Sequence, residues 1–151
     1  MVTTRPSLDQ VWDWLRAVPD PEIPVISVVD LGLIRDVRWE QDELVVAVTP
    51  TYSGCPANAA IALAIEGELR GRGVQELRLE RRLAPPWTTD WMTDSGRRQL
   101  EQFGIAPPGS AACPRCGSID TVRVSAFGST PCKALWRCRA CLEPFDQFKC
   151  I

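Results

Sequence analysis

Four of the seven cysteines form two Cys-x-x-Cys pairs near the C-terminus, and this spacing could hold a metal ion. The pairs, in "CPRCG" and "CRAC", are separated by 21 residues. Two-residue spacing lets both thiolates of a tight turn face one ion, and two such turns supply the four sulfurs of a tetrahedral zinc site. The pattern predicts a structural zinc site whose ligands are Cys113, Cys116, Cys138 and Cys141. A rubredoxin-like iron site, which uses similar ligands, is the alternative.

Cys55 could supply a reactive thiol. It stands between Gly54 and Pro56 in "TPTYSGCPANAA", where a strand is expected to end and a helix to begin. If Pro56 is the first helical residue, Cys55 is the N-cap, where backbone N–H groups and the helix dipole favour the thiolate. A plain cap or a small buried residue is the alternative, although Ser or Asp would cap better.

Cys132 directly precedes Lys133, and Cys150 directly follows Lys149; these are the chain's two lysines. A nearby cation lowers the pKa of a thiol and raises its reactivity. The alternative is that one of these thiols is buried and the other lies in a loose tail, since free cysteines are commonly buried.

The chain has no histidine, which narrows the chemistry it can perform. Neither a Ser–His or Cys–His nucleophile pair nor a His-containing catalytic zinc site can form within it. Asp20, Glu22 and Asp30 fall in expected turns. Their carboxylates could contact a metal or orient a loop, and ordinary turn chemistry is the alternative.

The composition is that of an ordinary soluble globular protein, with 45% apolar and 24% charged residues. The net charge of −2 gives no reason to expect a nucleic-acid or membrane-surface partner. No stretch approaches the ~18 uninterrupted apolar residues of a membrane span, and the N-terminus lacks the features of a signal peptide. We therefore expect a cytoplasmic protein.

Hydrophobic patterning predicts an α+β domain over residues 1–84 in the order helix, β-hairpin, helix, strand. Helical spacing marks residues 8–17, and residues 33–50 contain two strands joined near residues 40–43, the second apolar on both faces and therefore buried on both. Residues 56–70 form the clearest helix, with Pro56 at its first position. Residues 74–83 alternate as a half-exposed strand.

The C-terminal part is expected to hold two further segments. Residues 85–110 contain a short helix between two Pro-Pro pairs, capped by Asp94 or Ser95 and ended by Gly104, and residues 106–112 are expected to be a linker. Residues 111–151 form the four-cysteine zinc ribbon, with strands in "TVRVSAFG" and "ALWR". So short a segment buries little core, so the metal supplies folding energy.

Several motifs resemble known families. "DPEIPVISVVDLGLIRDV" and "TPTYSGCPA" are similar to the SufT-like domain of iron–sulfur protein assembly. "PPWTTDWMT", "FGSTPCKALWRCRAC" and "EPFDQFKCI" resemble the PaaD (also called PaaJ) family of phenylacetate degradation, and this likeness covers nearly the whole chain.

The resemblance implies an auxiliary subunit of the phenylacetyl-CoA ring-1,2-epoxidase system, which takes part in aromatic compound degradation. Such a subunit helps to assemble or maintain the di-iron centre of the oxygenase and the [2Fe–2S] cluster of the flavin-containing reductase, and does not itself perform the epoxidation. Oxygenase and reductase subunits are thus the expected partners. By resemblance, Cys55 is the reactive cysteine, Thr49 and Thr51 lie on the approach to it, and Asp20, Glu22 and Asp30 match the acidic motif.

Three functions therefore compete. The first is a metal-centre assembly factor, in which Cys55 holds iron or an iron–sulfur cluster transiently, either alone, across a homodimer, or with Cys132 or Cys150. The second is a zinc-ribbon binding or scaffold module without metal transfer; a local charge of +3, from six basic and three acidic ribbon residues, disfavours nucleic acid as its ligand. The third is a thiol enzyme, for which no histidine is available to activate Cys55.

Overall fold

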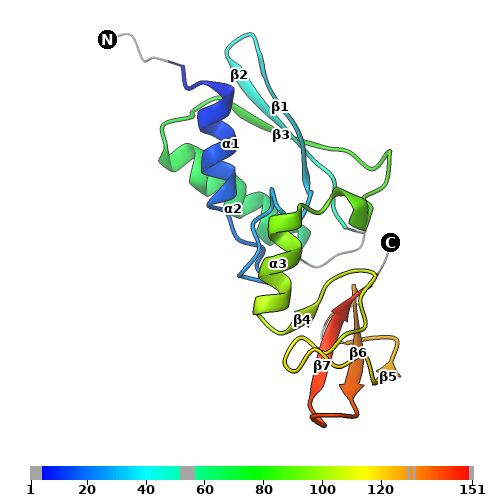
Figure 1. The fold of residues 1–151 in the computed structure, drawn as a ribbon. Helices are drawn as coiled ribbons and strands as arrows, with labels where there is room; N and C mark the ends of the chain where they lie inside the picture. The colour runs from blue at the N-terminus through cyan, green and yellow to red at the C-terminus, as the bar shows by residue number, and fades with distance from the viewer. Residues whose placement is uncertain (1–4, 52–56, 129, 131, 150–151) are drawn as a thin grey trace. The chain divides into compact units, whose positions relative to one another are not determined.

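The computed structural model describes residues 5–51, 57–128, 130 and 132–149, and the chain folds as two compact units, residues 1–87 and 88–151 (Figure 1). The division at residues 84 and 110 that the sequence suggests stays a prediction. Among the described residues, no helix combines the length and the apolar character needed to cross a membrane.

The first unit begins with α1 (Leu8–Arg16), as predicted. The helix starts where it does because Ser7 and Gln10 form a capping box. The Ser7 hydroxyl accepts the N–H of Gln10 at 3.1 Å, and the Gln10 side chain accepts the N–H of Ser7 at 3.0 Å. Together these bonds satisfy two backbone groups that a helix end otherwise leaves unpaired.

A three-stranded sheet forms the body of this unit, in the order β1-β2-β3. Its strands are β1 (Ile34–Glu40), β2 (Glu43–Val48) and β3 (Leu77–Arg81). The predicted hairpin of β1 and β2 is confirmed, whereas β3 pairs with β2 in parallel. A parallel neighbour requires a crossover connection, which is supplied by α2 (Asn58–Gly71). Helices α1 and α2 contact each other and lie on the same side of the sheet (Figure 1).

The middle strand β2 is buried on both faces, which confirms the prediction from its apolar pattern. Val45 lies in register between Arg38 of β1 and Arg78 of β3. These arginines form ion pairs of 2.6 Å with Glu80 and Glu40, respectively. Because all five side chains share one face of the sheet, the ion-pair network covers Val45, which is fully buried.

The start of α2 differs from the prediction. The helix begins at Asn58, with Ala57 as its N-cap, and not at Pro56. The N-cap position expected for Cys55 therefore belongs to Ala57, while Cys55 and Pro56 themselves lie outside the described residues. The buried side chains of the helix are Ile61, Ile65 and Leu69, which lie four residues apart on one face.

Trp87 ends the first unit and anchors the turn before β1. Its indole N–H donates to the carbonyl oxygen of Leu31 at 3.0 Å, and both residues are buried. The adjacent Gly32 has a φ of 84°, a conformation that residues with a Cβ rarely adopt. Trp87, 56 residues from Leu31 in the sequence, thus holds the turn that leads into β1.

The second unit opens with a 3₁₀ turn, η1 (Thr89–Trp91), and α3 (Asp94–Gln102). The N-cap of α3 is Thr93, whose hydroxyl accepts the N–H of Gly96 at 3.0 Å, so the prediction of Asp94 or Ser95 as cap is wrong by one or two positions. The helix ends at Gln102, and Gly104, the predicted stop, follows the C-cap Phe103 with a φ of 93°.

A four-stranded sheet completes the second unit, in the order β4-β7-β6-β5. Its strands are β4 (Ile105–Ala106), β5 (Thr121–Ser125), β6 (Lys133–Cys138) and β7 (Pro144–Phe148). The two predicted strands are present as β5 and β6. The predicted linker over residues 106–112 needs correction, because Ala106 belongs to β4 and is fully buried beside β7.

Candidate metal centre

The two Cys-x-x-Cys segments form two turns of the same construction. In the first, the N–H of Cys113 donates to the carbonyl of Ser118 at 2.9 Å, and in the second, the N–H of Cys138 donates to the carbonyl of Glu143 at 3.0 Å. Both bonds span five residues, and they close each turn around its pair of cysteines. The sequence prediction missed these two carbonyls, because every residue carries one and no residue type marks the acceptor.

A residue in the left-handed backbone conformation follows the second cysteine of each turn. Gly117 has a φ of 76° and Leu142 a φ of 67°. Glycine adopts this conformation without strain, whereas a side chain with a Cβ does so at a cost. The local geometry that directs each cysteine pair is therefore repeated, with glycine in one turn and leucine in the other.

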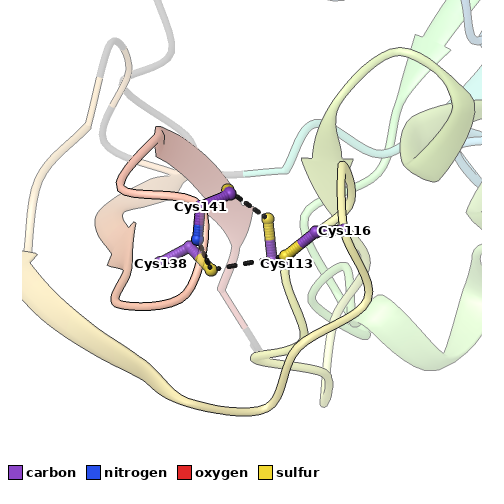
Figure 2. A group of neighbouring side chains, drawn as sticks. All are labelled: Cys113, Cys116, Cys138 and Cys141. Atoms are coloured by element: carbon purple, nitrogen blue, oxygen red, sulfur yellow. Dashed lines mark hydrogen bonds between the residues drawn. The ribbon is translucent and has the colours of Figure 1, made fainter.

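The turns bring four sulfurs together, as Figure 2 shows. The Sγ atoms of Cys116 and Cys138 are 3.5 Å apart, those of Cys113 and Cys141 are 3.7 Å apart, and all four lie within 4.8 Å of one another. A tetrahedral zinc ion with Zn–S bonds of ~2.3 Å requires sulfur separations of about 3.8 Å. The four side chains thus fit one tetrahedral ion.

Burial and charge favour a cation at this position. Cys113 and Cys138 are buried, Cys141 is half-buried and Cys116 is exposed. The N–H of Cys141 donates to the Cys138 sulfur at 3.4 Å and, with other local contacts, lowers the pKa of Cys138 to about 7. The N–H of Glu143 lowers the pKa of Cys141, but burial and the neighbouring thiols outweigh it and raise that pKa to about 11. Four close sulfurs become thiolates together only with a positive ion to offset their repulsion.

The same cysteines make up much of the ribbon's core. The buried cluster consists of Ala106, Cys113, Cys138 and Phe145, and Trp136 and Cys141 pack against it. With so few apolar side chains available, the sulfurs occupy the space that larger domains fill with aliphatic groups. A bound metal would accordingly contribute to the stability of the ribbon.

Cys132 lies apart from this group. It is buried, and its Sγ is 3.0 Å from the hydroxyl oxygen of Thr130. The ammonium of Lys149 donates to the carbonyl of Ala126 at 2.8 Å and stacks on the ring of Phe127 at 4.6 Å. A reactive role for Cys132 remains a prediction.

Cys55 and Cys150, which the sequence marks as candidate thiols, lie outside the residues that the structure describes. Their roles as iron or cluster ligands accordingly remain predictions.

The predicted acidic residues have clear local contacts. Asp20 is buried, and one carboxylate oxygen accepts the N–H groups of Glu22 and Ile23 at 2.8 and 2.9 Å. The backbone N–H of Asp30 donates to the Ser27 hydroxyl at 3.0 Å. These contacts hold the turns of the segment "DPEIPVISVVD", and a role toward metal remains a prediction.

The two threonines on the expected approach to Cys55 differ in exposure. Thr49 is buried, and its N–H donates to the carbonyl of Leu33 at 2.8 Å, while Thr51 is half-buried. Within the described residues, the one group of three or more Cys, Asp or Glu side chains placed to share an ion is the ribbon's four cysteines. In the part of the chain that the structure describes, Asp20, Glu22 and Asp30 are therefore not gathered into a metal site of their own.

The fold and the sulfur cluster define a class of protein: an α+β unit followed by a metal-binding β-ribbon. Residues 8–76 match the family model described as iron–sulfur cluster assembly protein, and residues 99–149 match that of the PaaD zinc beta ribbon domain. A protein of Escherichia coli (strain K12), provisionally named as one of the subunits of 1,2-phenylacetyl-CoA epoxidase, is 44% identical over 156 residues, which cover 97% of this chain and 94% of that protein. The chain belongs to this PaaD family.

Two solved structures are similar in fold to more than half of this chain. A domain of unknown function, DUF59, from Bacillus anthracis is 28% identical with a TM-score of 0.56, and the match covers 61% of this chain and 89% of that one. A conserved hypothetical protein from Thermotoga maritima is also 28% identical with a TM-score of 0.56, covering 68% of this chain and 99% of that one. The predicted α+β class is thereby confirmed.

Proposed function

We propose that this protein is an accessory subunit of a phenylacetyl-CoA 1,2-epoxidase system that assembles or maintains the iron centres of its oxygenase and reductase. The observation that carries the proposal is the end-to-end similarity to a protein named as one of the subunits of such an epoxidase. The match of residues 8–76 to an iron–sulfur cluster assembly family supports the choice of metal-centre assembly over epoxidation itself.

In this proposal the ribbon and Cys55 have different tasks. The ribbon cysteines Cys113, Cys116, Cys138 and Cys141 hold a zinc ion that keeps the second unit folded, in keeping with their tetrahedral spacing. Cys55 is the thiol that holds iron or an iron–sulfur cluster on its way to a client, because thiolate sulfur is the ligand that such clusters require. Cys132 and Cys150 are the candidate additional ligands within the chain, and Cys55 of a second protomer is the alternative.

Co-expression with the oxygenase and reductase subunits tests the proposal. Wild type, Cys55→Ala and Cys132→Ala would each be produced with the clients, and the iron content and cluster absorbance of each client would be measured. We expect low loading with Cys55→Ala at unchanged zinc content of the ribbon. Full client loading with Cys55→Ala would contradict the assembly role of this thiol.

A scaffold function without metal transfer is the second candidate. It is favoured by one observation, namely that the described residues contain a single group suited to metal, and this group has the closed four-sulfur geometry of a structural site. A scaffold predicts that all variants load the clients normally, and that loss of the ribbon cysteines prevents co-purification with the oxygenase or reductase.

A further inference from the structure

The indole N–H of Trp136 is buried and has no hydrogen-bond acceptor within the described residues. Trp136 lies on β6, two residues before Cys138, and packs on the buried cluster that contains Cys113 and Cys138. Its Nε1 is shielded from solvent and has no hydrogen-bond partner in the described part of the chain. A buried N–H that forms no bond costs about 1–3 kcal/mol, so such a group needs an explanation.

The neighbours of the indole limit what could accept this proton. Trp136 pairs in register with Phe145 of β7 and Arg123 of β5, neither of which carries a side-chain acceptor, and the remaining members of the cluster are an alanine and cysteines. Among these side chains, sulfur alone can accept a hydrogen bond. Trp136 and Cys138 also share a face of β6, because residues two apart in a strand point to the same side.

The two buried sulfurs differ in the donors they already have. The Cys138 sulfur receives the N–H of Cys141 at 3.4 Å. Cys113 is also buried, and its sulfur lies 3.7 Å from the Cys141 sulfur and has no N–H donor among the described contacts. Metal-bound thiolates carry negative charge, and outer N–H donors to such ligands are a common means of stabilising them.

We propose that Trp136 is a positioning residue of the metal centre, whose indole N–H donates to a buried ligand sulfur, Cys113 or Cys138, when the ribbon holds its metal. The bond would offset part of the charge on that thiolate and fix its orientation. The inference rests on the metal-binding part of the proposed function and is independent of the role of Cys55.

Nuclear magnetic resonance of the full-length protein loaded with an NMR-active cadmium isotope tests the bond directly. Cadmium replaces zinc at four-sulfur sites, and a hydrogen bond to a ligand sulfur transmits scalar coupling from the metal to the proton. We expect coupling between cadmium and the Trp136 indole proton, together with slow exchange of that proton. A cadmium resonance typical of four sulfurs without coupling to this proton would overturn the inference. A missing cadmium resonance would instead overturn the metal-binding proposal on which it rests.

Two variants give a second, spectroscopic readout with cobalt in place of zinc. Trp136→Phe removes the N–H and keeps an aromatic ring, whereas Phe145→Leu trims the facing side chain without removing a polar group. We expect Trp136→Phe to weaken metal affinity about 10-fold, as loss of outer-shell partners does. It should also move the sulfur-to-cobalt charge-transfer band to longer wavelength, and Phe145→Leu should leave the band in place. Equal bands in wild type and Trp136→Phe, or the same shift in both variants, would mean that Trp136 serves packing alone.

Discussion

Substitution of Gly117 by alanine isolates the backbone contribution to metal binding. Gly117 follows Cys116 with a φ of 76°, and a Cβ placed there would meet nothing within 4 Å. The change therefore adds no clash and affects only the left-handed conformation, which costs a residue with a Cβ about 1–2 kcal/mol. Alanine recovers roughly 0.5–1 kcal/mol of this, because it loses less chain entropy on folding than glycine.

With both terms at the middle of their ranges, the balance is a net cost of about 0.75 kcal/mol in the folded ribbon. Because structural zinc sites couple binding to folding, this cost should appear in the metal affinity, at 1.36 kcal/mol for each factor of ten. We expect zinc to bind Gly117→Ala about 2- to 5-fold more weakly than wild type in a chelator competition titration.

Gly73→Ala is the matched control. Gly73 has a φ of 99° and equally open surroundings, but it belongs to the first unit. It should lower the stability of that unit and leave zinc affinity unchanged. The reasoning would be refuted by wild-type zinc affinity in Gly117→Ala, or by an equal loss of affinity in Gly73→Ala.

Three further predictions concern the first unit. Ile65 is fully buried, so Ile65→Ala should lower the free energy of unfolding in urea by about 2–5 kcal/mol, whereas Leu63→Ala, at a site 70% exposed, should change it little; similar effects would contradict the described core. Hydrogen bonds from Arg38 and Arg82 lower the pKa of Glu80 from 4.5 to about 2, so the stabilisation is present above pH 4.5 and is lost as the pH falls through 2. Acid unfolding of Glu80→Gln should thus depend less on pH over this window, and a profile parallel to wild type would count against the network. Asp20→Ala removes the acceptor of two N–H groups and should destabilise by about 1–3 kcal/mol, while Asp20→Asn keeps an acceptor oxygen and should unfold near the wild-type midpoint; equal losses in both would show that the charge matters.

Local patterns in the sequence predict much of the first unit. The apolar run of β2 and the helical spacing of α1 are properties of neighbouring residues, and both elements form where expected. The parallel pairing of β3 with β2 could not be predicted in this way, because it depends on how α2 carries the chain back across the sheet. The ion pairs that cover Val45 likewise depend on charged residues of β1 and β3, so the sequence of β2 alone does not predict them.

The starts of α2 and α3 are harder to predict from the sequence than the positions of β2 and α1. Thr93 caps α3 because its extended backbone directs the hydroxyl at the N–H of Gly96, and several nearby polar residues could have served equally by sequence alone. Ala57 occupies the N-cap of α2 without a side-chain bond, so no residue type marks this start. The sequence therefore marks the ligand spacing of the ribbon but not the N-cap of α2, which was expected at Cys55 and lies at Ala57.

The ribbon shows what ligand spacing can and cannot predict. Two Cys-x-x-Cys pairs are enough to foresee that four sulfurs meet, because each pair belongs to one tight turn. The contributions of Ala106 and Trp136 to the surrounding core were not foreseen, since they come from a two-residue strand and from a side chain whose partners lie on other strands. Sequence spacing thus predicts the ligands, and tertiary packing determines their environment.

The metal content of the purified full-length protein tests the central claim most directly. Elemental mass spectrometry should find one zinc ion per chain in wild type and in Cys55→Ala, and none in a variant with Cys113 and Cys138 both changed to serine, because the described residues contain a single four-sulfur group. A wild-type protein that folds without metal, or a double variant that keeps its zinc, would contradict the account.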